Sequence, residues 1–281
     1  MSDVLPALAI SPFLSQLHVY DVDAAKEFKS QNEALDALAA EAVLSGNPVL
    51  SEDDRTLGAA VAIPVFRENE IVSVVAMATA GAPEMTGVFE IWSPIGEYDE
   101  LGLSQGYFGD LGRFKNVSSF VRFEKGSGLP GQVWDLHQSV IHDNLSSHPG
   151  FLRAAGASAG KLSTAIGISV AGSEFVSAVL LISSDATPIA KGFEVWEATE
   201  KGFTLCSAAY HDKSIARELG TTLSVTEGVP GLTHTLGRAV LSDDAACLSA
   251  GRPTTENKLS IGLGIPCFKS KTLASVTTVL F

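Results

Sequence analysis

Cysteine is scarce in this sequence, and no apolar stretch is long. Only Cys206, Cys247 and Cys267 are present among 281 residues, and no two of them form a CxxC pair. The sequence therefore indicates neither a disulfide framework nor a zinc site. We expect buried or idle thiols in a reducing compartment. No apolar run reaches the roughly 18–20 residues of a membrane-spanning helix, so none is expected.

Basic residues are also in short supply. The chain has 19 Lys and Arg against 32 Asp and Glu, which gives a net charge of −13. A nucleic-acid backbone or an anionic membrane surface needs a basic face, so we expect neither as a partner. The start, Met1-Ser2-Asp3, lacks the basic and apolar segments of a signal peptide. A soluble, cytoplasmic protein is expected.

The sequence repeats itself at a spacing of about 100 residues, which is the size of a small domain. The segment 87–92 (GVFEIW) returns at 192–196 (GFEVW), and 128–131 (GLPG) returns at 228–231 (GVPG). The segment 165–170 (AIGISV) matches both 60–65 (AVAIPV) and 262–267 (GLGIPC). The chain is therefore interpreted as a series of related modules.

Each full copy shows the same order of predicted elements. Alternating apolar residues and glycine-containing turns predict an opening hairpin, and GLPG predicts a short helix with Pro130 in its first turn. Apolar runs around a Gly-Ser turn predict a closing hairpin. In the middle copy we expect strands at 88–92 and 101–109, a helix at 132–137, a strand at 140–141, a helix at 151–160, and closing strands at 164–170 and 176–183.

Three modules are predicted, and the first of them is incomplete. Residues 1–86 form a partial or divergent module, residues 87–190 the best-preserved one, and residues 191–281 a module without a C-terminal helix. The first module has an Ala/Leu-rich helix at 32–44 and strands at 48–53, 60–65 and 71–78. Between Leu5 and Lys29 no opening hairpin is predicted. Another chain that supplied the missing half would give an intertwined dimer.

A family resemblance follows from the middle copy. The run 121–134 (VRFEKGSGLPGQVW) resembles the RFxxGxGLPGxVW core of GAF domains, as do 89–92, 151–155 and the strand pair ending at Ser184. The resemblance is closest over 87–190 and weakest before residue 87. It implies an α+β fold, with a central antiparallel sheet of about six strands flanked by helices in each module. It also implies a sensory module that binds a small molecule or mediates dimerisation.

The chain departs from the specialised members of that family. Asn257-Lys258 is not followed by the phenylalanine and DE pair of cyclic-nucleotide binders. None of the three cysteines precedes a histidine, as it does in many bilin-binding relatives, and the middle copy has no cysteine. Reduction of free methionine sulfoxide is therefore not indicated, and the cofactor remains unknown.

Five residues of the middle copy are candidates for contact with a ligand. Arg153 could pair with a ligand carboxylate or phosphate. The alternative is an ion pair within an acidic protein. The aromatic candidates could line a pocket or belong to the core. The candidates are Tyr107, Trp134, His142, Phe151 and Arg153.

Three histidines, His137, His142 and His148, lie near Asp135 and Asp143 in the sequence. A histidine–carboxylate group could form a metal site or an acid–base pair. Their spacing fixes no common ligand geometry, so surface or capping roles are the alternative and no metal is expected.

The sequence supports one leading hypothesis and one rival. The leading hypothesis is a non-enzymatic sensory or regulatory protein of tandem GAF-like domains. Its middle domain would bind a small molecule and signal in a homodimer or to a separate partner. The rival is a degenerate array that acts as a dimerisation or scaffold protein without ligand. A thiol-dependent enzyme built on the three cysteines ranks third; serine nucleophile motifs are absent as well, and nothing in the sequence argues for an enzyme.

Overall fold

The computed structural model describes residues 10–22, 28, 32–54, 58–81, 84–96, 98–252 and 258–281. The elements fall into three successive groups, here called the first, middle and third modules. The first comprises β1 (Leu14–Asp21), α1 (Glu33–Ser45), β2 (Val49–Asp54), β3 (Gly58–Arg67) and β4 (Glu70–Thr79). The middle comprises β5 (Gly87–Pro94), β6 (Glu100–Tyr107), α2 (Gly112–Phe120), β7 (Phe123–Glu124), α3 (Gly128–Leu136), β8 (Val140–Asp143), α4 (Ala154–Ala159), β9 (Leu162–Ala171) and β10 (Phe175–Ser184). The third comprises β11 (Gly192–Thr199), β12 (Gly202–Tyr210), the 3-10 turn η1 (Lys213–Ile215), β13 (Thr222–Leu223), α5 (Gly228–Leu236), β14 (Val240–Ser242), α6 (Ala245–Ser249), β15 (Gly262–Lys269) and β16 (Thr272–Leu280).

Each module is built on one antiparallel sheet, and the connectivity recurs. The middle sheet has the order β7-β6-β5-β10-β9-β8, and the third has β13-β12-β11-β16-β15-β14. The first sheet has only four strands, in the order β1-β4-β3-β2. The expected α+β class, with six-stranded antiparallel sheets and flanking helices, is confirmed. The limits of the three domains stay a prediction.

The first module does contain one opening strand, which the sequence did not predict. β1 pairs with β4, just as β5 pairs with β10 and β11 with β16. Its side chains Leu14, Leu17 and Val19 are buried, so a short apolar strand forms there without the FEIW pattern. Counterparts of β6 and β7 are absent from the described part of this module. Residues 5–9, 23–27 and 29, which also belong to the predicted gap, lie outside the described residues.

Local sequence signals explain the helix that covers the first sheet. The side chain of Asn32 accepts hydrogen bonds from the amides of Ala34 and Leu35, which caps the start of α1. Gly46 ends the helix in the left-handed conformation, with φ of 68°, and donates to the carbonyl of Ala42. Both signals agree with the helix predicted at 32–44.

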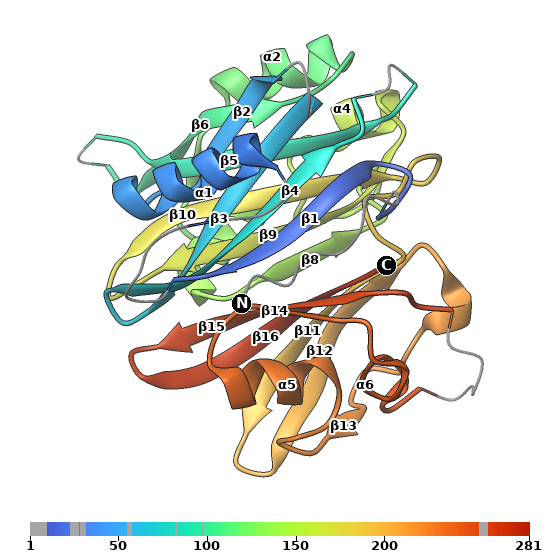
Figure 1. Ribbon diagram of the computed structural model, residues 1–281. Helices are drawn as coiled ribbons and strands as arrows, with labels where there is room; N and C mark the ends of the chain where they lie inside the picture. Colours follow the sequence, from blue (N-terminus) through green and yellow to red (C-terminus); the bar gives the residue numbers. More distant parts are fainter. Residues whose placement is uncertain are drawn as a thin grey trace.

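The sheets face one another, and most helices lie outside them. One apolar core takes residues from all three sheets, for example Ile63, Ile168 and Ile265. Separate smaller cores lie between each sheet and its own helices. In Figure 1 the third sheet lies below the other two, with α5 and α6 on its outer side and α2 and α4 at the opposite end of the molecule. Both faces of each sheet are therefore buried.

The three modules form a closed ring. β2 contacts β6, β8 contacts β12, and β14 contacts β1, so each module touches both others. β3, β9 and β15 converge on a small space lined by all three strands. Polar contacts also join each pair of modules, among them Leu50 N to Gln105 Oε1 at 2.7 Å, Ala239 N to Ser73 Oγ at 3.0 Å, and Thr277 Oγ1 to Ser139 Oγ at 2.6 Å.

Two helices differ from the sequence prediction. α4 begins at Ala154, because residues 151–153 form a turn, so the helix predicted at 151–160 is shorter than expected. α2 was not predicted, because most of its residues, Gly112–Phe120, are polar or small and only Phe114 and Ser118 are buried. Among the described residues, no helix has the length and apolar character needed to cross a membrane.

Candidate functional site

A buried glutamate recurs at the same place in two modules. Glu90 on β5 and Glu194 on β11 are both 0% exposed. Their strand neighbours Phe89 and Phe193 point into the shared core, so each glutamate points to the opposite face, under the helices of its own module. A buried carboxylate is costly unless it is paired and hydrogen-bonded. Each module must therefore supply partners for its glutamate.

In the middle module the partners form a closed network. Arg153 donates to both oxygens of Glu90, with the Nη2 to Oε2 distance at 2.8 Å, and also to Ser118 Oγ at 2.5 Å. Ser118 Oγ donates to Glu90 Oε1 at 3.0 Å, and Trp92 Nε1 donates to Glu90 Oε2 at 2.9 Å. Four side chains thus satisfy one another without solvent, which is the condition for a stable buried charge pair.

Aromatic rings enclose the same guanidinium. The Arg153 Cζ atom lies 4.7 Å from the ring centre of Phe114, 5.2 Å from Trp92, 5.3 Å from Phe151 and 5.8 Å from Phe123. These distances are within cation–π range. The arrangement resembles a cation-binding cage, and the chain's own arginine fills it.

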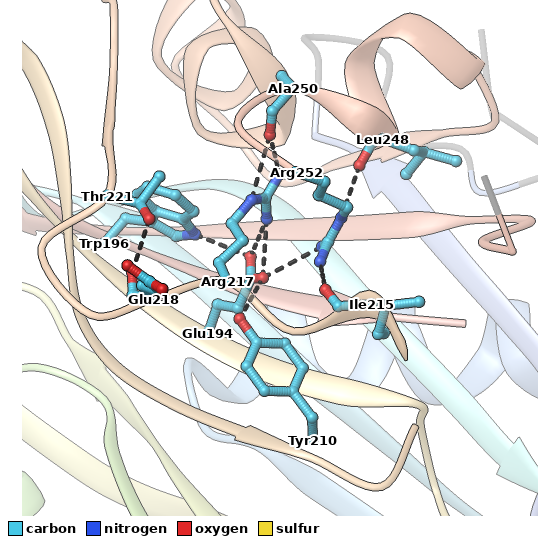
Figure 2. Close-up of polar contacts among 10 residues, drawn as sticks. All are labelled: Glu194, Trp196, Tyr210, Ile215, Arg217, Glu218, Thr221, Leu248, Ala250 and Arg252. Atoms are coloured by element: carbon cyan, nitrogen blue, oxygen red, sulfur yellow. Dashed lines mark hydrogen bonds and ion pairs between the residues drawn. The ribbon is translucent and has the colours of Figure 1, made fainter. Parts of the chain in front are cut away.

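The third module uses two arginines around Glu194, as Figure 2 shows. Arg217 Nη1 donates to both oxygens of Glu194, at 2.7 and 2.6 Å, and Arg252 Nη2 donates to Oε1 at 3.1 Å. Tyr210 Oη donates to Oε1 at 2.8 Å, and Trp196 Nε1 to Oε2 at 3.1 Å. Two buried guanidiniums therefore face one carboxylate.

Backbone carbonyls receive the remaining donors of these arginines. Arg217 donates from Nε to the Ala250 carbonyl at 3.1 Å and again from Nη2, while Arg252 donates to the Leu248 and Ile215 carbonyls. Burial lowers the pKa of Arg252, and burial beside Glu194 raises the pKa of Tyr210. Tyr210 therefore stays a neutral donor at physiological pH, and the cluster holds the segment after α6 in place.

The structure brings together some of the predicted site residues. Phe151 and Arg153 belong to the Glu90 network, and His142 lies beside Phe151, with ring centres 6.2 Å apart. Trp134 is partly buried at the edge of the core between the middle sheet and its helices, and its ring stacks on that of Phe175 with the ring centres 5.6 Å apart. Tyr107 packs on Phe89 in the core between modules, on the other face of the sheet. The role of all five in binding a ligand stays a prediction.

Two of the three clustered histidines meet. The rings of His142 and His148 stack with centres 3.8 Å apart, and His142 Nε2 bonds to Gln132 Oε1 at 2.9 Å. His148 Nδ1 accepts from the amide of Gly150 at 3.1 Å. His137 lies apart, at the C-terminal cap of α3. Among the described residues, no group of three or more His, Cys, Asp or Glu side chains could hold a metal ion.

Burial and the neighbouring His148 together lower the pKa of His142 to about 4. Its Nδ1 is buried and has no hydrogen-bond partner. A neutral ring is thus favoured, and the histidine pair fixes the loop that leads to Arg153.

The sequence prediction missed Glu90, Glu194, Arg217 and Arg252. One signal was available: the repeated FEIW and FEVW segments carry the same glutamate within otherwise apolar strands. A second was the arginine shortly before each closing hairpin, Arg153 and Arg252. Arg217 has no counterpart in the middle module and gave no such signal.

An open cleft lies beside the Glu194 cluster. Its volume is about 560 Å³, and it runs between the start of α5 and α6. The cleft is lined by Thr226, Glu227, Gly228, Leu232, Thr235, Ser242, Asp244, Ala246, Cys247 and Ala250. Because the Ala250 carbonyl accepts from Arg217, one residue belongs both to the cleft wall and to the buried cluster.

The cysteines are not arranged for shared thiol chemistry. Cys206 lies on β12, Cys247 on α6, and Cys267 on β15, where its Sγ donates to the His137 carbonyl at 2.9 Å. Burial raises the pKa of all three thiols, that of Cys267 to about 11. Thiols with raised pKa values are poor nucleophiles at neutral pH.

No protein-family model matches the chain, and neither does any curated protein. Similar solved structures include the GAF domain of A. aeolicus nlh2 in an inactive state, at 19% identity and a TM-score of 0.29, covering 35% of this chain and 58% of that one. Free methionine-R-sulfoxide reductase from Neisseria meningitidis, in complex with its substrate, matches at 15% identity and a TM-score of 0.28, covering 34% and 51%. The GAF domain of an Acinetobacter phosphoenolpyruvate-protein phosphotransferase matches at 17% identity and a TM-score of 0.26, covering 32% and 55%. The chain thus spans a little over half the length of these proteins, and likenesses of this level do not indicate what it binds.

Proposed function

We propose that this chain is a non-enzymatic regulatory protein that acts through interactions of its folded surface. The partner would be a separate signalling protein or a second copy of the chain. The observation that carries the proposal is the closed Glu90–Arg153 network, in which each charged group is bonded within the chain. Such a network holds a shape and leaves no charged group free for a reaction.

Binding of a small molecule by the middle module, the leading hypothesis from the sequence, receives less support from this geometry. Arg153 would contact a ligand only after leaving Glu90 and the four rings around it. Removal of one partner from a buried ion pair costs about 3–5 kcal/mol. A ligand would have to supply that free energy in addition to its own binding.

A thiol-dependent enzyme is also disfavoured. The three thiols lie on different elements of the third module, and their pKa values are raised. Replacement of Cys206 and Cys267, which do not line the cleft beside the Glu194 cluster, by serine should leave the protein's regulatory activity unchanged.

The direct test is the size of the native protein in fresh extract, followed by native mass spectrometry. We expect a defined assembly, either a homodimer or a complex with one partner. A bare monomer without any partner would overturn the proposal.

The matched variant for the middle module is Glu90→Gln with Arg153→Met, which removes both charges and keeps the volume. We expect it to retain the same bound masses as the unmodified chain. A small molecule that is present in the unmodified chain and lost from this variant would instead make the middle module a sensor.

A further inference from the structure

We propose that the cleft between α5 and α6 of the third module is a binding site for a small organic cation, such as a primary amine. The inference rests on the proposed regulatory function, for which this cleft would be the site that receives a signal. No sequence motif predicted the site, because its walls come from separated segments.

One side chain beside the start of α5 is smaller than the side chain at the matching place in the middle module. In the middle module the side chain of Leu152 lies 3.6 Å from the position that a Cβ on Gly128 would take. In the third module Ala250 takes that place against Gly228, at 3.4 Å. The loop after β14 therefore does not fill the space over the start of α5. A volume of about 560 Å³ remains, within the range of small-molecule sites.

The polar walls of the cleft mainly accept hydrogen bonds. The hydroxyl of Thr235 donates to the Gly231 carbonyl at 2.8 Å, so its lone pairs remain for another donor. The carboxylates of Glu227 and Asp244 accept from the backbone amides of Ser224 and Ala246 through one oxygen each, at 2.7 Å in both cases. The side chain of Ser224 also bonds to Glu227, whereas within the described part of the chain no hydrogen bond engages Oδ2 of Asp244. A ligand rich in donors fits these walls.

The charge at the cleft also favours a cation. No Lys, Arg or His lines it among the described residues, whereas two carboxylates do. Hydrogen bonds from Ser224 lower the pKa of Glu227, which keeps that carboxylate ionised. Arg217 lies behind the cleft wall, where its guanidinium is paired with Glu194. Glu227 and Asp244 are therefore the charged groups that line the cleft among the described residues.

Contact with the buried cluster would let the cleft report its occupancy. The Ala250 carbonyl accepts from Arg217, which bonds to Glu194, and Glu194 accepts from Trp196 Nε1. A ligand that shifts Ala250 would thus change the surroundings of a buried tryptophan.

Three probes of equal length test the proposal with the full chain: 1,4-diaminobutane, 1,4-butanediol and succinate. Isothermal titration should show binding of the diamine, with an affinity at least about tenfold above that of the neutral diol, and no binding of the anion. Equal binding of diamine and diol, binding of succinate alone, or no binding of the diamine would each overturn the proposal.

Variants place the diamine in the cleft. Glu227→Gln with Asp244→Asn keeps the backbone hydrogen bonds and should weaken binding about tenfold or more. Ala250→Leu, which copies Leu152 of the middle module, should abolish it. Thr235→Val is a milder change at an exposed position, for use if the leucine disturbs folding. The control is Glu174→Gln, an exposed carboxylate on the middle module, and an equal loss there would overturn the assignment.

A second readout separates failure of the site from failure of the regulatory function. Binding of the diamine should change tryptophan emission, and Trp196→Phe should remove that change. Binding without a change in emission would keep the cleft as a site but contradict its role as a receiver of signals.

Discussion

At the scale of single residues, Glu90 determines whether the middle module's buried arginine is tolerated. Among the described residues it provides the only carboxylate bonded to Arg153, whose side chain is 1% exposed. Glu90→Gln would leave a buried charge uncompensated, so we expect the free energy of unfolding to fall by about 3–5 kcal/mol. Urea denaturation measures this change.

The double variant Glu90→Gln/Arg153→Met should recover most of that loss, because a buried pair can be replaced by neutral groups at little cost. Glu52→Gln is the control, since the Glu52–Lys115 pair is about half exposed and such pairs contribute about 0–1 kcal/mol. Equal losses of stability in Glu52→Gln and Glu90→Gln would show that burial does not determine how much the Glu90–Arg153 pair contributes to stability.

His142 should make stability depend on pH. Its pKa in the folded protein is about 4, against 6.5 for the unperturbed group, so the unfolded chain binds the proton more readily between these values. Stability is therefore fully present above about pH 6.5 and falls as the pH drops toward 4, by up to about 3 kcal/mol. The His142→Asn variant should show a shallower fall in the free energy of unfolding over this window.

A comparison at pH 7.5 gives the control for this variant. Both proteins lack the charge there, so any difference reflects lost packing on His148 and Phe151 and the changed contact with Gln132. A pH dependence equal to that of the unmodified chain would rule out His142 as its source.

At the scale of elements, the GLPG turn is the feature that the sequence predicted best. A Cβ on Gly131 would lie 2.1 Å from the Glu124 carbonyl oxygen, whereas one on Gly112 at the start of α2 meets nothing within 4 Å. Gly131→Ala should therefore destabilise the protein by about 1–3 kcal/mol or more. Gly112→Ala should be neutral or stabilise it by up to about 1 kcal/mol. Thermal unfolding followed by circular dichroism compares the two, and similar midpoints would contradict this account of the turn.

Elements with a strong local signal were predictable, and those set by tertiary contacts were not. Asn32 and Gly46 mark α1, and the closing hairpins have apolar runs around a turn. α2 and β1 lack such signals, and they form because neighbouring sheets and cores cover them. The same reason applies to the candidate site: Arg153 was recognised from a motif, but its partner Glu90 looked like an ordinary polar residue of an alternating strand. Burial of both sheet faces could not be read from one strand.

At the scale of the whole molecule, the shared core should make the three modules unfold together. Ile63 of the first module is 1% exposed and packs in the cluster that also contains Val179 of β10 and Val279 of β16. Ile63→Ala should cost about 2–5 kcal/mol, and it should lower protection throughout the ring because no module can open alone. Leu44→Ala, an 88% exposed position on α1, is the matched control and should change little.

Hydrogen exchange measures this directly. In the Ile63→Ala variant, the slowest amides of β4, β10 and β16 should all exchange faster by the same factor. Faster exchange confined to β3 and β4 would show that the modules open independently, and the ring would then be an assembly of separate domains. A common factor would mean that the three modules open as one cooperative unit, held together by the core that they share.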